Sequence, residues 1–405
     1  MQKKLTKAPA ARANRYRYAF AIALTLASAE SSHAVGFLLP NQDPEAIGRG
    51  DAFAATADDP AAIYYNPAGI TQLPGIQASL GLYAISAYTR YFSSSTAETA
   101  HTDPRPQFVP QIYGVDTLKN LPISFGLGIY APYGLGVDWG AEPANPQPEK
   151  GNLTYLTANP VVAWKICKML SVAAGVTVNY ANASFAESDG IGVFKFSGHD
   201  LEPGFNLGIL FQPHPMWSFG VNYHSETDMN FSGKAMQVGD PFLPQTVYTS
   251  ARIDFPQTVV GGISFRPTPK WNLEFDLNWT QWSKVNEILL QNSPFGPYPI
   301  KLDYQDSFIY DFGVTRQLGK GYYASVGYIY AENSSPSAYF FPLIPDANLN
   351  LGNLGFGHRG KYVDWAIAYQ FAYNGGRPVS SSIYAYNGTY KTFNNAVNAS
   401  VTLKF

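Results

Sequence analysis

The sequence is short of cysteine, of charge and of long hydrophobic runs. Cys167 is the single cysteine among 405 residues, so no intramolecular disulfide framework can form. Charged residues make up 14%, against about 25% in ordinary soluble proteins. No interior stretch reaches the run of about 18 apolar residues that predicts a membrane-spanning helix. The formal charge of −2 gives no basic excess, which argues against a nucleic-acid binder.

The first 34 residues have the three-part pattern of a secretory signal peptide. Six basic residues come first, an apolar run covers 18–29, and Ser32-His33-Ala34 follows with small residues at its first and third positions. The apolar run is too short to cross a bilayer as a helix. Removal of residues 1–34 would take away six basic residues and Glu30, so the formal charge would change from −2 to −7. The remaining chain would be exported and acidic.

Aromatic residues are abundant at 15%, yet the mean hydropathy is only −0.13. The segment 271–280 shows how the two facts fit together, because apolar and polar residues alternate along it. Trp271 and Trp279 lie at the two ends of its apolar side. Successive side chains of a strand point to opposite faces of the sheet. Aromatic rings at both edges of an apolar band are typical of strands that cross a membrane.

This alternation recurs along the chain and predicts an all-β fold, a transmembrane antiparallel β-barrel of about 14 strands. A soluble β-sandwich is the alternative, but small and polar residues form the second face, which suits a barrel lumen. Short and long connections alternate, as in outer-membrane barrels. The predicted strands cover 77–91, 108–117, 122–132, 152–166, 170–184, 197–212, 216–236, 246–266, 271–291, 302–318, 321–332, 356–373, 380–386 and 390–405.

Residues 35–75 do not alternate and precede the predicted barrel, which covers 76–405. The segment is rich in glycine and proline and contains two short helical candidates, over 46–57 and 59–65. It is too apolar for a linker. A barrel of about 14 strands has a lumen wide enough to hold a plug. We therefore predict that this segment is a partly helical hatch inside the barrel.

Several motifs, in this order along the mature chain, resemble those of the FadL family of outer-membrane transporters for long-chain fatty acids and related hydrophobic compounds. The Asn-Pro-Ala motif of the predicted hatch is the most specific of them. The similarity is carried by Gly48-Arg49-Gly50, Ala57-Asp58-Asp59-Pro60, Tyr64-Tyr65-Asn66-Pro67-Ala68-Gly69-Ile70, Gly126 to Gly134, Asp138-Trp139, Gly204 to Leu210, Trp279 to Ser283 and Pro345-Asp346.

The resemblance implies a 14-stranded barrel plugged by its N-terminal domain, without enzymatic activity. Substrate would reach an apolar groove between extracellular loops, pass to an interior pocket and leave passively through a hatch-gated side exit beside a kink in the third strand. Family members carry long-chain fatty acids, our first expectation, or aromatic hydrocarbons such as toluene. The terminal Phe405 suits recognition by the barrel assembly machinery, and a monomer in the outer membrane is expected.

Asn66, Pro67 and Ala68 are the candidate gate of this hatch, together with Gly126 and Gly128 in the predicted third strand. Taken alone, Asn-Pro indicates only an extended or turn geometry after a helix. Matched to the family, Asn66 and Pro67 are expected to hold the hatch against 122–132. The two glycines would let that strand bend and leave a gap in the wall.

Apolar residues in two long predicted loops are the candidate substrate groove. Exposed apolar clusters on loops are unusual unless something binds them. The alternative is that these side chains pack among themselves and close the top of the barrel. The candidates are Phe185, Ile191, Phe194, Phe196, Met236, Phe242 and Leu243.

Arg252 is the candidate partner of a fatty-acid carboxylate. Its apolar neighbours Ala251, Ile253 and Phe255 would face lipid, which turns Arg252 to the lumen. The alternative is an ion pair with Asp254. An aromatic hydrocarbon would need no such cation.

No pattern for a catalytic, metal or cofactor site appears. His199, His214 and His224 lack metal-ligand spacing, and Glu274 and Asp276 are better explained as a polar barrel wall. A lipid hydrolase would need a Ser/His pair near the outer lipid interface, and none stands out. An open porin would have no use for a plug. We therefore favour a plugged transporter for hydrophobic molecules over both alternatives.

Overall fold

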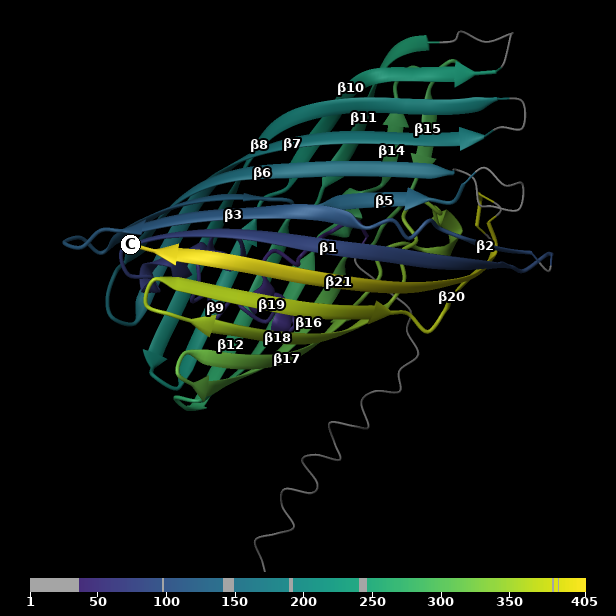
Figure 1. The fold of residues 1–405 in the computed structure, drawn as a ribbon. Helices are drawn as coiled ribbons and strands as arrows, with labels where there is room; N and C mark the ends of the chain where they lie inside the picture. The colour runs from purple at the N-terminus through teal and green to yellow at the C-terminus, as the bar shows by residue number, and fades with distance from the viewer. Residues whose placement is uncertain are drawn as a thin grey trace, which may run out of the picture. The chain divides into compact units, whose positions relative to one another are not determined.

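In the computed structural model, the chain forms a closed antiparallel β-barrel (Figure 1). The structure describes residues 36–96, 98–140, 149–188, 192–239, 246–380, 382–384 and 386–405. The predicted signal peptide, residues 1–34, lies outside this part of the chain. Among the described residues, no helix is both long and apolar enough to cross a bilayer.

Fourteen transmembrane strands build the wall, as predicted. Eleven of these strands consist of one segment, and each of the other three is interrupted and consists of two segments. In chain order the strands are β1 (Ile76–Ser93), β3 (Gln107–Thr117), β4 (Ile123–Tyr130) with β5 (Gly134–Asp138), β6 (Lys150–Lys165), β7 (Leu170–Ser188), β8 (Val193–His214), β9 (Trp217–His224) with β10 (Thr227–Val238), β11 (Thr246–Phe255) with β12 (Thr258–Thr268), β13 (Trp271–Thr280), β16 (Ser307–Gly319), β17 (Tyr322–Ala331), β18 (Leu349–Arg359), β19 (Val363–Tyr373) and β21 (Gly388–Lys404).

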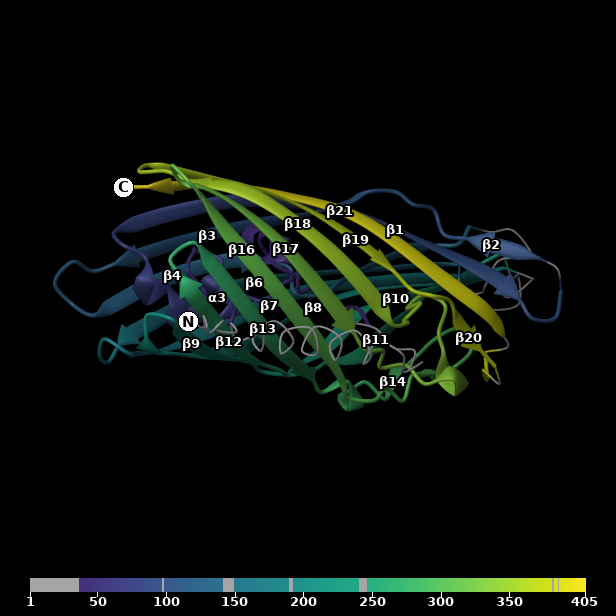
Figure 2. The same cartoon turned by 90° about the horizontal axis from the view of Figure 1, so that it is seen from below.

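The first and last strands close the barrel. β1 pairs with β21 along its whole length, from Gln77 opposite Lys404 to Ser93 opposite Gly388. Figure 2 shows the two strands side by side. Short turns lie at the end that holds the C-terminus, and the longer connections lie at the other end. These connections carry the short elements β2 (Thr99–His101), η2 (Trp282–Lys284), β14 (Glu287–Leu290), β15 (Tyr298–Lys301), η3 (Ser337–Tyr339) and β20 (Arg377–Val379).

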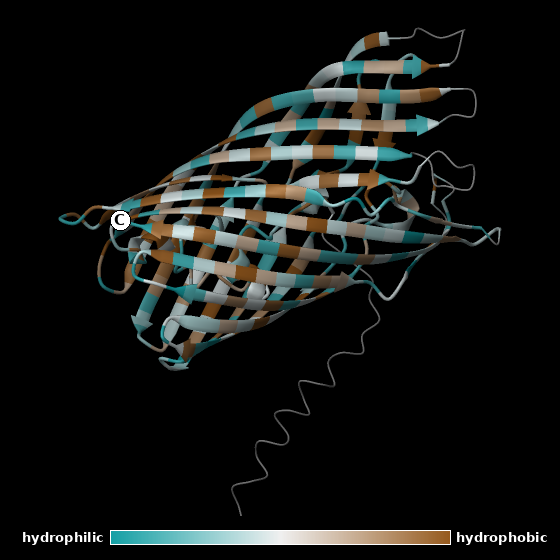
Figure 3. Cartoon of the chain, in the orientation of Figure 1, coloured by the Kyte–Doolittle hydropathy of each residue, from teal (hydrophilic) through white to brown (hydrophobic). Residues whose placement is uncertain are grey.

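Apolar side chains face outward and polar side chains face inward, as the alternation predicts. In β13, Glu274 and Asp276 are buried, whereas Leu273, directly before Glu274, is 41% exposed. Figure 3 shows the same alternation of hydropathy along most strands. In a bilayer the outward side chains are covered by lipid.

The predicted positions of the twelfth and thirteenth strands are wrong. The prediction placed one strand over 356–373, but β18 and β19 divide this segment at a turn over 360–362. β18 starts at Leu349, inside a predicted loop, and no strand covers 380–386 within the described residues. The cause is composition: the glycines and asparagines of 349–359 have low intrinsic strand propensity, and pairing with both neighbours supplies the missing stabilisation.

Residues 36–75 pack inside the barrel and form α2 (Pro44–Gly48), α3 (Ala62–Tyr65) and the 3-10 helix η1 (Pro67–Gln72). The predicted helices over 46–57 and 59–65 are therefore too long. Asp43 caps α2 by accepting from the Glu45 N–H at 2.6 Å. Gly50 and Asp51 then adopt positive φ, which ends the helix. The segment makes most of its contacts with barrel strands rather than within itself.

Candidate transport pathway

The third transmembrane strand is interrupted. β4 ends at Tyr130 and β5 begins at Gly134, with Pro132 between them. A proline lacks the N–H that a strand interior needs, so it favours a break here. β4 pairs with β3 only from Ile112 to Thr117, and β5 pairs only with β6 among the described residues.

This break leaves a window in the barrel wall between residues 107–111 of β3 and residues 131–137. A main-chain bond from Asp103 N–H to the Asp138 carbonyl, 2.8 Å long, bounds the window on the loop side. The side-chain amide of Gln107 spans it and donates to the Gly136 carbonyl at 3.1 Å. The end of the Gln107 side chain occupies the space where a Cβ at Gly136 would lie. The window is thus crossed by one flexible side chain instead of a ladder of strand hydrogen bonds.

The start of the N-terminal segment covers the window from inside. Leu39 N–H donates to the Pro132 carbonyl at 2.7 Å, and Gly134 N–H donates to the Phe37 carbonyl at 3.0 Å. Leu38 and Tyr133 form an antiparallel bridge between these two bonds. Residues 37–39 therefore act as a short strand added to the edge that the break exposes.

The Phe37 side chain projects into an aromatic cluster in the lumen. Its ring centroid lies 4.9 Å from that of Trp282, 5.4 Å from that of Phe255 and 5.9 Å from that of Tyr133. Edge-to-face pairs of this kind each contribute about 0.5–1.5 kcal/mol beyond their buried area. The Phe37 side chain is therefore held by ring contacts alone.

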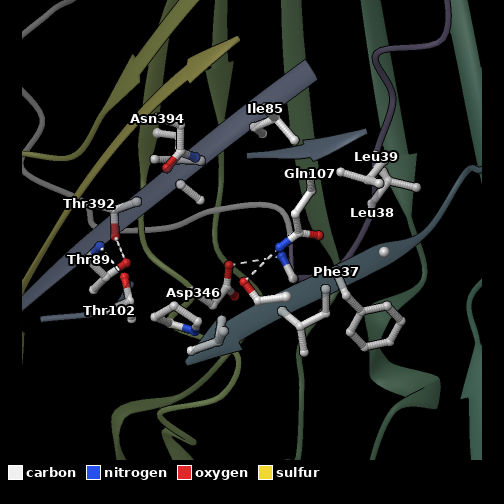
Figure 4. A pocket seen from close by; sticks show the side chains of 18 of the residues that line it. Phe37, Leu38, Leu39, Ile85, Thr89, Thr102, Gln107, Asp346, Thr392 and Asn394 are labelled. Carbon is white, nitrogen blue, oxygen red and sulfur yellow. Dashed lines mark hydrogen bonds between the residues drawn. The ribbon is translucent and has the colours of Figure 1, made fainter. Parts of the chain in front are cut away.

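Two pockets meet at Phe37 and Leu135. The lateral pocket, of about 180 Å³, lies behind the window, where Figure 4 shows Phe37 and Gln107 on its wall. The upper pocket, of about 70 Å³, lies nearer the long loops and is lined by Phe185, Phe196 and other apolar side chains. Because both pockets share Phe37 and Leu135, removal of these side chains would join them.

A long loop holds the first described residue of the segment. The Asp346 carboxylate accepts from Gly36 N–H at 2.9 Å and from the N–H groups of Ser334 and Ser335 at 2.9 and 3.0 Å. Arg377 donates to the Asp346 main-chain carbonyl at 2.5 Å. Burial raises the pKa of Asp346, while Arg377 and these hydrogen bonds oppose that rise. The Asp346 carboxylate therefore connects the loop to the start of the N-terminal segment.

Buried carboxylates of β13 hold a later part of the segment. Asp276 accepts from the N–H groups of Phe53 and Ala54 at 2.8 and 2.7 Å. Glu274 accepts from Ala55 N–H at 2.7 Å and also from Thr56. A buried acceptor left unsatisfied costs about 1–3 kcal/mol. These two residues fasten the turn after α2 to the wall.

The family model for the outer membrane protein transport proteins (OMPP1/FadL/TodX) matches residues 25–405. The chain belongs to this family. Its members are channels and transporters of the outer membrane, which places this chain in that membrane and supports the expectation that it is no enzyme.

Two curated relatives and two solved structures agree with the family. A 47 kDa outer membrane protein of Pasteurella multocida is 24% identical over 64% of this chain and 68% of its own. An outer membrane protein of Neisseria meningitidis is 28% identical over 28% of this chain, and the match spans only 26% of that relative's length.

The solved structures are similar in fold. A FadL homologue of Pseudomonas aeruginosa superposes with a TM-score of 0.82 at 17% identity, over 92% of this chain and 100% of that one. The toluene transporter TbuX of Ralstonia pickettii gives 0.70 at 18% identity, over 91% and 100%. At these identities the similarity concerns the barrel and its plugged interior, without bearing on substrate.

In this FadL/TodX family member, the predicted gate residues do not lie at the break between β4 and β5. Gly126 and Gly128 lie in the paired part of β4, where Ile63 of α3 packs against both. The predicted bend at these glycines is wrong, because their missing side chains make room for Ile63. The bend lies at 131–133, where Pro132 was the available signal in the sequence.

Asn66, Pro67 and Ala68 contact β8, whereas the prediction placed them against 122–132. The Asn66 side chain donates to the carbonyls of Ala54 and Ile209 at 2.7 and 2.9 Å, and its oxygen accepts from Ala68 N–H at 3.2 Å. A Cβ at Gly208 would collide with Asn66 and Pro67. The motif therefore caps η1 and fixes it to the wall on the side of β8.

The predicted groove residues lie in strands as far as they are described. Phe185 and Phe196 border the upper pocket, and Phe194 is buried with its ring 5.5 Å from that of Tyr298. Met236 is half-buried near the end of β10. Three further candidates, Ile191, Phe242 and Leu243, lie outside the described residues.

The predicted orientation of Arg252 is wrong. Its side chain is 59% exposed and pairs with Asp254 at 2.7 Å and Asp228 at 3.1 Å, the alternative that the sequence left open. Ala251 and Phe255 are buried in the interior cluster instead. The cause is the interruption at Pro256 between β11 and β12, since a one-residue shift moves every side chain to the other face.

Proposed function

We propose that this chain lets hydrophobic molecules cross from the cell exterior into the outer membrane by passive diffusion. A molecule enters the upper pocket, passes Phe37, reaches the lateral pocket and leaves through the window beside Gln107. The observation that carries the proposal is that an apolar upper pocket and a lateral pocket of mixed polarity meet at one aromatic side chain behind a break in the wall. Burial of each CH₂ group would contribute about 0.8 kcal/mol to capture.

In this proposal residues 35–75 are the hatch, and only its first residues move. Displacement of residues 36–39 breaks the main-chain bonds at Pro132 and Gly134 and opens the lateral pocket toward the bilayer. A movement of the loop would displace Gly36 through its hydrogen bond to Asp346. Asn66, Pro67 and Ala68, with Gly126 and Gly128, keep the remainder of the hatch in place rather than serving as its moving part.

The lining of the pockets bears on the substrate class. Neither the upper nor the lateral pocket has a Lys, Arg or His in its described wall, and the lateral pocket contains Asp346. Burial of a substrate's carboxylate in these pockets, without a cationic partner, would be unfavourable. This lining favours an uncharged molecule, such as an aromatic hydrocarbon, over the fatty-acid anion expected from the sequence.

Three further expectations are part of the proposal. Residues 1–34 are a cleaved signal peptide, and the folded barrel is a monomer. Phe405 is 78% exposed and its N–H donates to the Ile76 carbonyl at 2.9 Å, which leaves the ring free for the assembly machinery.

The test is saturable binding of oleate and of toluene to the folded, delipidated barrel, each with the other as competitor. The pocket lining predicts that toluene binds and that oleate binds weakly at neutral pH. Tight oleate binding that toluene does not disturb would assign a fatty-acid transporter. Binding of neither ligand would contradict transport of hydrophobic molecules, and large steady conductance of the wild-type barrel would favour a porin.

A further inference from the structure

The short turns of the barrel carry an unusual set of charges. Six short turns connect transmembrane strands at the end where the C-terminus lies (Figure 1). None of them contains Asp or Glu, and five of the six contain an exposed lysine. These lysines, which we call the turn lysines, are Lys119, Lys168, Lys270, Lys320 and Lys361.

The turn lysines have no carboxylate partner in the described part of the chain. By contrast, two cations at the long-loop end lie against carboxylates: Arg105 with Asp103, and Lys150 with Asp138. The mature chain would be acidic overall, so the unpaired cations of the turns are a local feature. They present a ring of positive charge in the periplasm, where short turns lie.

Outward-facing aromatic rings lie directly beside this ring of charge. The Arg316 guanidinium lies 5.0 Å from the ring centroid of Trp271, which begins β13 and is 38% exposed. The Lys361 ammonium lies 4.8 Å from the ring of Tyr362, which is 63% exposed. Trp271 shares the outward face of β13 with Leu273, so these cations lie at the border of the lipid-facing band.

We propose that the turn lysines and Arg316 bind the phosphates of anionic phospholipids in the periplasmic leaflet of the outer membrane. A cation beside a lipid-facing indole lies at headgroup depth, with its stem along apolar surface. Anionic headgroups attract basic residues near a membrane surface. A soluble acidic partner would need a single continuous patch, whereas these cations are spread over five separate turns.

The test is native mass spectrometry of the full-length mature barrel in detergent, titrated with phosphatidylglycerol or with phosphatidylcholine of the same acyl chains. We expect at least tenfold tighter binding of phosphatidylglycerol to the wild type. The variant K119Q/K168Q/K270Q/K320Q/K361Q should reduce this preference to less than twofold. The matched control, K150Q/K195Q/K234Q/K301Q/K391Q, removes five lysines from the long-loop half and should keep the preference.

Equal affinity of the wild type for both lipids would overturn the proposal, as would equal loss in the two variants. Binding of a soluble polyglutamate peptide with no preference between the lipids would also overturn it and indicate a protein partner. Heat-modifiable migration on a gel reports whether each variant is folded. If the variant with five lysine substitutions does not fold, Arg316→Gln alone should still lower the preference for phosphatidylglycerol measurably. Toluene binding should be unchanged in all of these variants, so the result is independent of the proposed transport.

Discussion

The two parts of the N-terminal segment are held to the barrel by different chemistry. Residues 36–39 are held by main-chain hydrogen bonds to an interrupted strand and by Asp346 of a long loop. Residues 53–56 are held by two carboxylates buried in the wall, Glu274 and Asp276. Release of the first part breaks two main-chain bonds, at Pro132 and Gly134, and one bond to the Asp346 carboxylate. Release of the second part breaks five hydrogen bonds to two adjacent carboxyl groups and leaves their buried oxygens unsatisfied, which is more unfavourable.

This difference indicates that the two parts of the segment have different roles. The part with fewer hydrogen bonds to the barrel covers the window, and the part held by Glu274 and Asp276 fills the lumen and blocks an open pore. Gating can then proceed without loss of the plug, since opening the window does not require Glu274 and Asp276 to lose their partners.

The largest effect is expected from Asp276→Ala, which converts the fixed part into a loose one. Phe53 and Ala54 lose their acceptor, and we expect the free energy of unfolding to fall by roughly 3–5 kcal/mol. The plug should also leave the lumen at times, which gives large single-channel conductance in a planar bilayer. The control is Glu202→Ala, which removes a half-buried carboxylate of β8. Silent bilayers with Asp276→Ala would contradict the anchoring role.

The next effect is a pH dependence that comes from Asp51, which lies just before the fixed part. Burial raises the pKa of Asp51 to about 7, although hydrogen bonds from Tyr65 and Asn41 oppose the rise. The folded chain therefore binds a proton that the unfolded chain releases near pH 4. The contribution of Asp51 to stability is greatest below pH 4 and falls on the order of 4 kcal/mol as the pH rises to 7. Urea unfolding of Asp51→Asn between pH 4 and 7 should show a slope that is reduced accordingly; an unchanged slope would exclude Asp51 as a source of it.

A smaller but more specific effect is expected from Phe37→Ala, in the movable part. Loss of this ring joins the two pockets, so uptake of toluene should rise several-fold while the plug stays in place. Phe53→Ala is the matched variant in the fixed part. It should cost about 3–5 kcal/mol of stability without faster uptake. If both variants changed uptake equally, the division between the two parts would be wrong.

The wall was predictable from the sequence because its signal is local. Alternation such as that of 271–280 fixes which face meets lipid, and the fourteen strands follow from its repetition. The exceptions arise where nonlocal pairing decides. β18 is a strand because of its neighbours, in spite of its glycines. The interruption at Pro256 reversed the expected face of Arg252, which no count along the strand reveals.

The site was predictable only in outline. The Asn-Pro-Ala motif correctly marks a part of the segment that touches the wall, but its partner strand is β8 rather than the third strand. The break at 131–133 depends on residues 37–39, about a hundred positions earlier in the chain, which supply the missing hydrogen bonds. Phe37, Gln107 and the fixing carboxylates have no local pattern that distinguishes them from other barrel residues.

The most direct test of the account locks the movable part to the window. Leu38 and Tyr133 face each other in an antiparallel bridge, a separation that suits a disulfide. In a background with Cys167→Ser, the pair L38C/Y133C should block toluene uptake when oxidised and restore it after reduction. The control pair A84C/V397C crosses the closing seam of the barrel and should transport equally in both states. Uptake by the oxidised L38C/Y133C barrel at the reduced rate would contradict the claim that residues 36–39 gate the window.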